Sequence, residues 1–390
     1  PAGVRFSDRH GGEVTKQPVE IDNCWADTNL NGHPHYMLKE MLEQPDVLRR
    51  TLGGRVTADG LDADLGLEVD PTAIDRVVLV AAGTASYAAT VGEALLERLA
   101  RLPAKVVVAS EFRYQEPVVD GRTLVVAVSQ SGETIDTLEA VREARRRGAR
   151  ALAILNVKGS SLAREADDVL YIHAGPEIGV ASTKAYVAMV AAFALLALRF
   201  GRARGTLEDA AARTWVAGLN DLPDQVALAL SRRAEVAAVA ERVALARDAL
   251  FLGRGFDVAT AFEGALKLKE ISYLHAEAYA TGEMKHGPIA LIDRDMPVVA
   301  IATPSSTYAK TVSNLQEVRA RDGWVVVIAG DGDERIGAHA DAVLRVPVVA
   351  EALAPIVNVV PLQLLAYEVA VRLGRDVDQP RNLAKSVTVE

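Results

Sequence analysis

The sequence predicts an α/β protein in which two similar, doubly wound parallel sheets follow one another and a C-terminal tail completes the chain. Continuous apolar, β-branched runs alternate with helical patterns, which is typical of parallel strands covered on both faces. The same order of elements occurs twice, and Gly83 and Gly253 occupy the same place in the two copies. The last residues, 376–390, show neither pattern and form the tail.

The first copy follows a lead-in, residues 1–35, of poor periodicity. A helical pattern then covers residues 37–52, and Pro45 is expected to divide it because proline interrupts a helix interior. Strands are expected at 76–83, 104–110, 123–129, 151–157 and 168–174, and helices at 86–101, 134–147 and 181–201.

The second copy repeats the strand, glycine turn and helix of residues 76–100 at 248–272. Further along, residues 296–330 repeat the strand, helix and strand of 123–157, and residues 339–349 repeat the strand of 165–175. Two copies are too few for a solenoid, so two tandem domains are expected.

The boundary between the copies is expected in or near 201–235, around Pro223. The predicted divisions are a lead-in with the first helix (1–55), a first subdomain (56–215), a second subdomain (230–375) and the tail (376–390).

Composition narrows the class of protein. The 390 residues are 50% hydrophobic and 24% charged, which is the balance of a globular protein. No apolar run looks long and uncharged enough to span a membrane, and the N-terminus has no hydrophobic signal core. The net charge of −9 argues against non-specific nucleic-acid binding. Cys24 is the one cysteine, and we expect an incidental thiol in a cytoplasmic protein.

The most informative segment is SQSGET, residues 129–134, where a predicted strand becomes a helix. In doubly wound sheets, ligands bind at the carboxyl ends of strands, beside helix N-termini. A glycine lets the backbone approach an anion, and free N–H groups with hydroxyls favour a phosphate. Helix capping needs only one hydroxyl, so a phosphate site is the better explanation. Its candidate ligands are Ser129, Gln130, Ser131 and Thr134.

Two further turns could line the same pocket. AAGTASY, residues 81–87, supplies Thr84 and Ser86 after a strand, although its spacing is not that of a dinucleotide site. GPEIGVASTKAY, residues 175–186, supplies Ser182 and Thr183, for which ordinary helix capping is an equally good explanation.

Titratable residues concentrate in residues 263–288. Glu263, Lys267 and Glu270 share one helical face, where a solvated ladder of ion pairs is the usual explanation. A carboxylate beside a lysine and a histidine, such as His286, also suits proton transfer near neutral pH. In the tail, Lys385 would pass for a solvated lysine unless the tail folds over a carbonyl substrate, where the amine could form a Schiff base.

These motifs resemble the sugar-isomerase (SIS) family, and more specifically the isomerase domains of the glutamine–fructose-6-phosphate aminotransferases (isomerizing), or glucosamine-6-phosphate synthases. The resemblance covers roughly residue 33 to the end. It rests on SQSGET, EIGVASTKA, LGRG, EGALKLKEISYLHAEAY, GEMKHGP and DQPRNLAKSVTVE, in that order.

The resemblance implies two tandem SIS subdomains that bind fructose 6-phosphate and interconvert ketose and aldose without a metal or cofactor. It implies that Glu270 moves a proton between C1 and C2, that Lys267 lies beside it, and that Lys385 forms the Schiff base. His286 would open the sugar ring, reaching a neighbouring subunit's site, so a homodimer is expected. The implied phosphate and sugar contacts are Thr84, Ser86, Ser129, Gln130, Ser131, Thr134, Val180, Ser182 and Ala384.

The sequence also departs from this family. Members carry an N-terminal glutaminase domain with a cysteine nucleophile at its first residue, whereas residue 1 here is Pro. GVRFSDRHGGEV resembles the last strand of that domain and the linker after it, so we expect a fragment that needs an external ammonia supply to make glucosamine 6-phosphate. Ala82 and Ala85 stand where many relatives carry Cys and Ser.

Two other functions remain open on the same fold. One is a stand-alone deaminase or deglycase of a phosphorylated amino sugar, which would not need the tail. The other is a sugar-phosphate sensor, which would be expected to carry a DNA-binding helical module.

Overall fold

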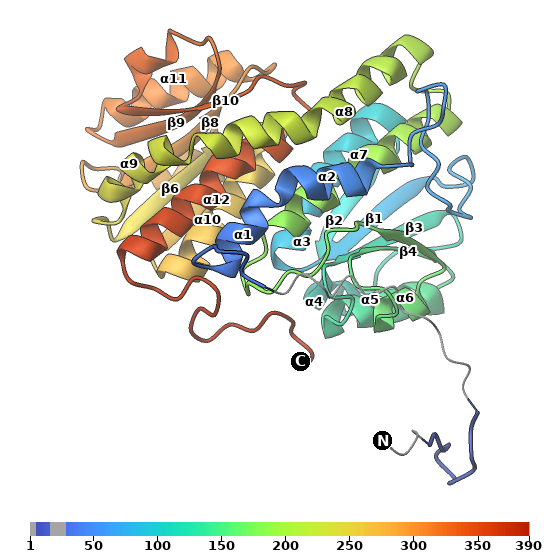
Figure 1. Cartoon of the computed structure of the whole chain (residues 1–390). Helices are drawn as coiled ribbons and strands as arrows, with labels where there is room; N and C mark the ends of the chain where they lie inside the picture. The colour runs from blue at the N-terminus through green and yellow to red at the C-terminus, as the bar shows by residue number, and fades with distance from the viewer. Residues whose placement is uncertain (1–4, 16–28, 390) are drawn as a thin grey trace.

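Two five-stranded parallel sheets make up the computed structural model, which describes residues 5–15 and 29–389 (Figure 1). The strand order is β2-β1-β3-β4-β5 in the first sheet and β10-β9-β8-β6-β7 in the second. Every pairing within them is parallel, which confirms the predicted fold class. Cys24 lies outside the described residues.

The first half begins with two short helices and continues as an alternation of strands and helices. Its elements are α1 (Tyr36–Leu42), α2 (Gln44–Leu52), β1 (Arg76–Ala81), α3 (Gly83–Leu95), the π-helical η2 (Leu96–Ala100), β2 (Ala104–Val108), α4 (Ala109–Phe112), η3 (Arg113–Gln115), β3 (Thr123–Ser129), α5 (Ile135–Arg146), β4 (Arg150–Leu155), α6 (Ser161–Glu165), β5 (Asp168–Tyr171) and α7 (Lys184–Ala203). Pro45 lies in the first turn of α2, so it divides the two helices as expected.

The second half repeats this plan after two linking helices. Its elements are α8 (Asp209–Ser231), α9 (Arg233–Val243), β6 (Asp248–Gly253), α10 (Asp257–Ser272), β7 (His275–Ala280), η4 (Glu283–His286), η5 (Pro288–Leu291), β8 (Pro297–Ala302), α11 (Tyr308–Arg319), β9 (Trp324–Gly330), η6 (Ile336–His339), β10 (Ala342–Val346) and α12 (Ala354–Arg372). The expected boundary therefore falls within helices, and Pro223 lies inside α8.

The central strands explain the continuous apolar runs in the sequence. Every residue of β3 is buried, and β3 pairs with β1 on one side and β4 on the other. A strand covered on both faces needs apolar side chains in both orientations, so alternation is lost. The same holds for β8, which lies between β6 and β9 and is also buried throughout.

Helices between the two sheets join the halves into one core. α3 and α7 pack on the first sheet, α10 and α12 on the second, and α10 contacts α3 (Figure 1). The outer face of the first sheet is covered by α4, α5 and α6, and that of the second by α11. The carboxyl-terminal edges of the two sheets are thereby held in a fixed relation.

Two apolar helices of this core, α7 and α12, contradict the expectation that no apolar run is long and uncharged enough to span a membrane. α7 and α12 are long and apolar enough to cross a membrane by length and composition alone, with mean hydropathies of 1.6 and 1.5. In the structure, 94% of each apolar segment is buried against the rest of the chain. Burial of this kind is what the core helices of a globular protein show.

The strand order predicts where a ligand would bind. In a sheet of order 2-1-3-4-5, the chain reverses direction between the first and third strands, and ligands bind in the crevice at that point. In the first half this point lies between β1 and β3, whose following segments carry Thr84 and the SQSGET turn. In the second half it lies between β6 and β8.

Candidate active site

The turn of residues 129–134 is folded by its own hydroxyl groups. The amide of Gly132 donates to Oγ of Ser129 (3.0 Å), and the amide of Glu133 donates to Oγ of Ser131 (3.2 Å). Each serine oxygen accepts a backbone hydrogen bond here, so its own proton remains for another acceptor. Thr134 is the N-cap residue of α5, but its side chain makes no capping hydrogen bond. Capping therefore does not account for these hydroxyls.

Gly132 is required by this turn for two reasons. Its φ angle is +69°, in the left-handed region that side chains disfavour. A Cβ atom there would also lie 2.1 Å from Oγ of Ser160. The turn therefore packs closely against Ser160, the N-cap residue of α6. The amide of Leu162 donates to the carbonyl of Gly132 (3.0 Å).

Thr84 links the first half of the chain to the second. It lies in the first turn of α3 and is 9% exposed. Nζ of Lys267 donates to Oγ1 of Thr84 (3.0 Å), and that hydroxyl donates to Oε1 of Glu263 (3.2 Å). Both partners lie on α10, so the polar chain crosses the boundary between the halves.

The three titratable residues of α10 are not a solvated ladder. Glu263 and Lys267 are fully buried, and the Glu270 side chain is 21% exposed. Nζ of Lys267 lies 2.6 Å from Oε2 of Glu270 and 3.5 Å from Oε1 of Glu263. Burial, opposed by the charge of Lys267 and assisted by the charge of Glu270, raises the pKa of Glu263 to about 8. Burial lowers the pKa of Lys267, but the two carboxylates outweigh it and leave that pKa above its usual value.

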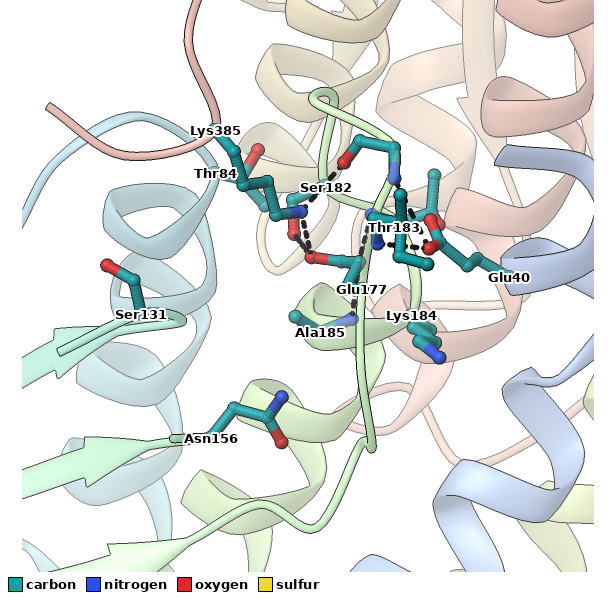
Figure 2. Close-up of polar contacts among 12 residues, drawn as sticks. Glu40, Thr84, Ser131, Asn156, Glu177, Ser182, Thr183, Lys184, Ala185 and Lys385 are labelled. Atoms are coloured by element: carbon teal, nitrogen blue, oxygen red, sulfur yellow. Dashed lines mark hydrogen bonds and ion pairs between the residues drawn. The ribbon is translucent and has the colours of Figure 1, made fainter. Parts of the chain in front are cut away.

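A second buried carboxylate, Glu177, organises the loop before α7 (Figure 2). Its Oε1 accepts from the amides of Thr183 (2.9 Å) and Ala185 (3.1 Å), and its Oε2 accepts from the hydroxyl of Ser182 (2.8 Å). Glu177 therefore caps α7, and the hydroxyl of Thr183 makes no capping bond. This overturns the explanation of Ser182 and Thr183 as ordinary caps.

The tail brings Lys385 to Glu177. Nζ of Lys385 donates to Oε2 of Glu177 (2.7 Å) and to the carbonyl of Gly179 (2.8 Å) (Figure 2). Burial raises the pKa of Glu177, but the charge of Lys385 and the donated hydrogen bonds lower it further, to about 2. Glu177 is therefore a carboxylate near neutral pH.

Further contacts hold the tail across the site. The Oγ atoms of Ser386 and Ser131 are 3.1 Å apart, and the amide of Ile135 donates to the carbonyl of Val387 (3.1 Å). Before Lys385, the carboxylate of Asp378 accepts from the first two amides of α1, at 2.9 and 2.8 Å. The tail thus runs from the second half to the SQSGET turn of the first (Figure 1), and Lys385 is not a solvated lysine on a frayed end.

The remaining predicted residues lie at different distances from this cluster. The amide of Val180 donates to the tail carbonyl of Asp378 (2.9 Å), and Ala384 directly precedes Lys385. The carbonyl of Gln130 accepts from the amide of Asn156 (3.2 Å). Ser86 lies in the first turn of α3 with Thr84. His286 is exposed at the end of η4 in the second half, and no described contact joins it to Glu270 or Lys385.

Sequence reasoning missed two carboxylates, Glu177 and Glu40, and the burial of a third, Glu263. Glu177 lies inside the motif of residues 175–186, and Glu263 has the spacing of a solvated ladder of ion pairs. Glu40 lies on α1, and its Oε1 accepts from the amides of Ile178 and Gly179. Burial, followed by the charge of Glu177, raises the pKa of Glu40 to about 8. The available signal was a charged residue inside an otherwise apolar helical face, MLKEML.

The equivalent turn of the second half is occupied by the chain itself. Oε1 of Glu351 accepts from the hydroxyl (2.8 Å) and the amide (3.2 Å) of Ser306. Its other carboxylate oxygen pairs with Arg98 of the first half at 3.0 Å. A carboxylate thus takes the position that an anionic ligand would need. Among the described residues, no group of three or more His, Cys, Asp or Glu side chains could hold a metal ion.

Comparison with known proteins identifies the family. A model described as the SIS domain matches residues 72–199 and 243–373. The chain is 61% identical over 388 residues to a glutamine–fructose-6-phosphate aminotransferase [isomerizing] of Thermus thermophilus, and 51% identical over 394 residues to that of Symbiobacterium thermophilum. These matches cover all of this chain but 64% and 65% of the relatives' lengths.

Comparison with solved structures leads to the same family. The C-terminal domain of glucosamine-fructose-6-phosphate aminotransferase from Francisella tularensis is 39% identical with a TM-score of 0.85, over 90% of this chain and all of that one. A glucosamine-6-phosphate deaminase from Thermotoga maritima matches with a TM-score of 0.72 at 23% identity, over 90% of this chain and 99% of that one, which shows the shared fold alone. The chain belongs to the SIS domain family, and within it to the C-terminal isomerase domains of the glutamine–fructose-6-phosphate aminotransferases.

Proposed function

We propose that this chain binds fructose 6-phosphate and isomerises it, and that it forms glucosamine 6-phosphate when ammonia is supplied. The observation that carries the proposal is the position of the tail. It holds Lys385 on the buried Glu177 and meets the hydroxyl-rich turn at Ser131, at the crevice where this sheet order places ligands. The names of the relatives and the resemblance of the motifs support the same substrate.

In the proposed complex, the phosphate is bound by the turn at the N-terminus of α5. The hydroxyls of Ser129, Ser131 and Thr134 and the backbone amides donate to the phosphate oxygens, with Gln130 beside them. The tail contacts at Ser131 and Ile135 then give way to the ligand. The open-chain sugar lies between Thr84, Ser86, Val180, Ser182 and Ala384.

Lys385 forms the Schiff base in this proposal. Its ammonium first loses a proton to solvent, because the lowered pKa of Glu177 makes that carboxylate, at 2.7 Å, a weak base. The free amine attacks the C2 carbonyl, and loss of water leaves an iminium. Ammonia then displaces the lysine at C2, and the resulting imine remains bound to the site.

Glu270 then moves the proton. Its carboxylate removes a proton from C1 and an enolamine forms. The carboxyl group, which is partly exposed and exchanges its proton with solvent, then delivers a proton to C2. Without ammonia, the corresponding cis-enediol gives glucose 6-phosphate. Lys267, charged and 2.6 Å from Glu270, stabilises the negative charge that develops on the sugar oxygen. This chemistry uses no metal or organic cofactor.

Two partners complete the proposal. His286 opens the sugar ring from a second copy of the chain, because within one chain it lies exposed on η4 and no described contact joins it to Lys385; the active form is then a homodimer. The relatives are longer than this chain, and a glutaminase domain of the kind the resemblance implies would supply the ammonia. We place the reaction in the cytoplasm, with no nucleic-acid or membrane partner.

The test is direct conversion. The purified chain is incubated with fructose 6-phosphate, with and without an ammonium salt, and the products are separated by chromatography and identified by mass. We expect glucose 6-phosphate without ammonium and glucosamine 6-phosphate with it. Release of ammonia from glucosamine 6-phosphate, without synthesis at high ammonium, would instead support a deaminase.

A further inference from the structure

One buried group of the site has no role in the proposed chemistry. Glu263 is fully buried on α10, and its Oε2 atom has no hydrogen-bond partner in the structure. A buried carboxyl group costs free energy unless its partners compensate. Its partners here are Lys267, at 3.5 Å, and the hydroxyl of Thr84 across the boundary between the halves. A side chain placed at that cost between two site residues invites a functional explanation.

The directions of the hydrogen bonds that Thr84 makes with Lys267 and Glu263 provide a functional explanation. A threonine hydroxyl has a single proton and two acceptor lone pairs. Lys267 can only donate, so the Thr84 oxygen accepts from it, and the Thr84 proton is then directed to Oε1 of Glu263. What remains on Thr84 is one lone pair. A ligand group at Thr84 must therefore be a donor.

We infer that Glu263 is a positioning residue that fixes the hydroxyl of Thr84 as a hydrogen-bond acceptor for the substrate. Thr84 then selects a sugar hydroxyl and rejects a phosphate or carbonyl oxygen, which places the sugar chain, and not the phosphate, against α3. This inference rests on the proposed function and deepens it, because it assigns the chemical class of the group at Thr84.

The acceptor oxygen, rather than the negative charge, is the property of Glu263 that this role requires. The pKa of Glu263 is raised to about 8, chiefly by burial, so the group is largely neutral at pH 7. Oε1 faces the ammonium of Lys267 at 3.5 Å, so the proton of the neutral carboxyl group lies on Oε2. Oε1 therefore remains an acceptor, as the oxygen of a glutamine amide would be. Glu263→Gln should therefore preserve the role, and Glu263→Met, of similar length but without an acceptor, should abolish it.

The experiment is a double-mutant cycle with Thr84→Val, which keeps the shape of Thr84 and removes its hydroxyl. The dissociation constant for fructose 6-phosphate and kcat/KM for its isomerisation are measured at pH 7 for the full chain. We expect Glu263→Met to weaken binding and lower kcat/KM about 10-fold with Thr84 present, and less than about twofold in the Thr84→Val background, since coupled residues are non-additive. We expect Glu263→Gln to remain within about threefold of the parent, since an acceptor is retained.

A matched control comes from the same helix. Asp257 is also a buried carboxyl group on α10, but it is bonded to Asn358 and Thr303 of the second half. Asp257→Asn should combine additively with Thr84→Val, because the two residues share no partner. Thermal unfolding of each variant shows whether it is folded.

Three results would overturn the inference. Equal losses in Glu263→Gln and Glu263→Met would show that charge is what matters. A loss in Glu263→Met that persists undiminished in Thr84→Val would show a structural role, and wild-type behaviour of Glu263→Met would show no role. If Glu263→Met does not fold, the test rests on Glu263→Gln. A 10-fold loss of affinity and of kcat/KM in that variant would reject the inference. A parent chain that neither binds nor converts fructose 6-phosphate refutes the proposed function itself, whereas one that binds without turnover still tests Glu263 through the dissociation constants.

Discussion

Nζ of Lys385 lies 2.7 Å from Oε2 of Glu177, although the two residues are 208 positions apart in the sequence. The same carboxylate caps α7 and accepts from Ser182, so one buried group fixes a helix, a sugar-contact candidate and the tail. We therefore expect Glu177→Gln to free the tail and lower kcat at least 100-fold, since Lys385 would no longer be held in place. Ser182→Ala, which removes one of these contacts, should cost much less.

The stability of the Glu177 variant should follow pH in a defined way. The pKa of Glu177 is lowered from 4.5 to about 2, so its contribution is complete above pH 4.5 and is lost as pH falls towards 2. Breaking a buried pair of which one member can move into solvent should cost about 2–3 kcal/mol. Urea unfolding should show a constant difference between variant and parent from about pH 5 to 6, below the range in which the coupled Glu40 ionises, and a shrinking one below pH 4.5. A difference that grows in acid would contradict the ion pair.

Glu40 should have the opposite pH dependence. Its pKa is raised to about 8, first by burial and then by the charge of Glu177, so its stabilising neutral form is complete below pH 4.5 and is lost as pH rises to 8. Glutamine keeps an acceptor for the amides of Ile178 and Gly179 and never ionises. We expect Glu40→Gln to be more stable than the parent at pH 9, by at most about 5 kcal/mol at about 1.4 kcal/mol per pKa unit, and similar at pH 4.5. A variant that is less stable than the parent at pH 9 would refute this.

Gly132 offers a test of the phosphate turn. In Gly132→Ala, the new Cβ would meet Oγ of Ser160 at 2.1 Å in addition to the cost of a positive φ. We expect a loss of about 2–3 kcal/mol in unfolding free energy and at least a 10-fold rise in KM, because the turn must shift. Gly205→Ala is the matched control, since Gly205 has φ +68° with open space around it, and it should lose only about 1 kcal/mol and leave KM unchanged. Equal effects in the two variants would mean that the close approach to Ser160 is unimportant.

The origin of His286 can be tested by mixing inactive chains. If each site needs His286 from the other copy, His286→Asn and Lys385→Arg are each inactive alone. Mixed and allowed to exchange subunits, they form dimers with one complete site, and activity should return to about 25% of the parent for random pairing in a C2 dimer. Activity that stays at the level of the separate variants, in dimers shown to have exchanged, would place His286 in its own chain's site or outside the chemistry.

Much of the fold followed from local patterns. The apolar runs predicted nine of the strands because central strands lose alternation when both faces are buried. The missed strand, β7, is HAEAYA, which has no β-branched residue and lies at the edge of its sheet. Helix α3 begins at Gly83 rather than at residue 86, because the glycine adopts a positive φ and starts the turn itself.

The site was predictable where its residues are close in sequence and not where they meet through the fold. The hydroxyls of residues 129–134 and the spacing of Glu263, Lys267 and Glu270 were visible. Their burial was not, because it depends on α10 packing against α3 of the other half. The pairing of Lys385 with Glu177 and the occupation of the second turn by Glu351 also depend on contacts between distant segments.

The central claim is that this site transfers a proton between C1 and C2 of a phosphorylated sugar, with Glu270 as the base. The most direct measurement is incubation of the chain with fructose 6-phosphate in D₂O, followed by NMR of the sugar, alongside Glu270→Gln. The account predicts glucose 6-phosphate carrying deuterium at C2 with the parent chain and, because the base is lost, conversion at least about 100-fold slower with Glu270→Gln. Deuterium incorporation at the parent rate by Glu270→Gln would contradict the account, as would a parent chain that binds the sugar phosphate in the presence of ammonium and converts none of it.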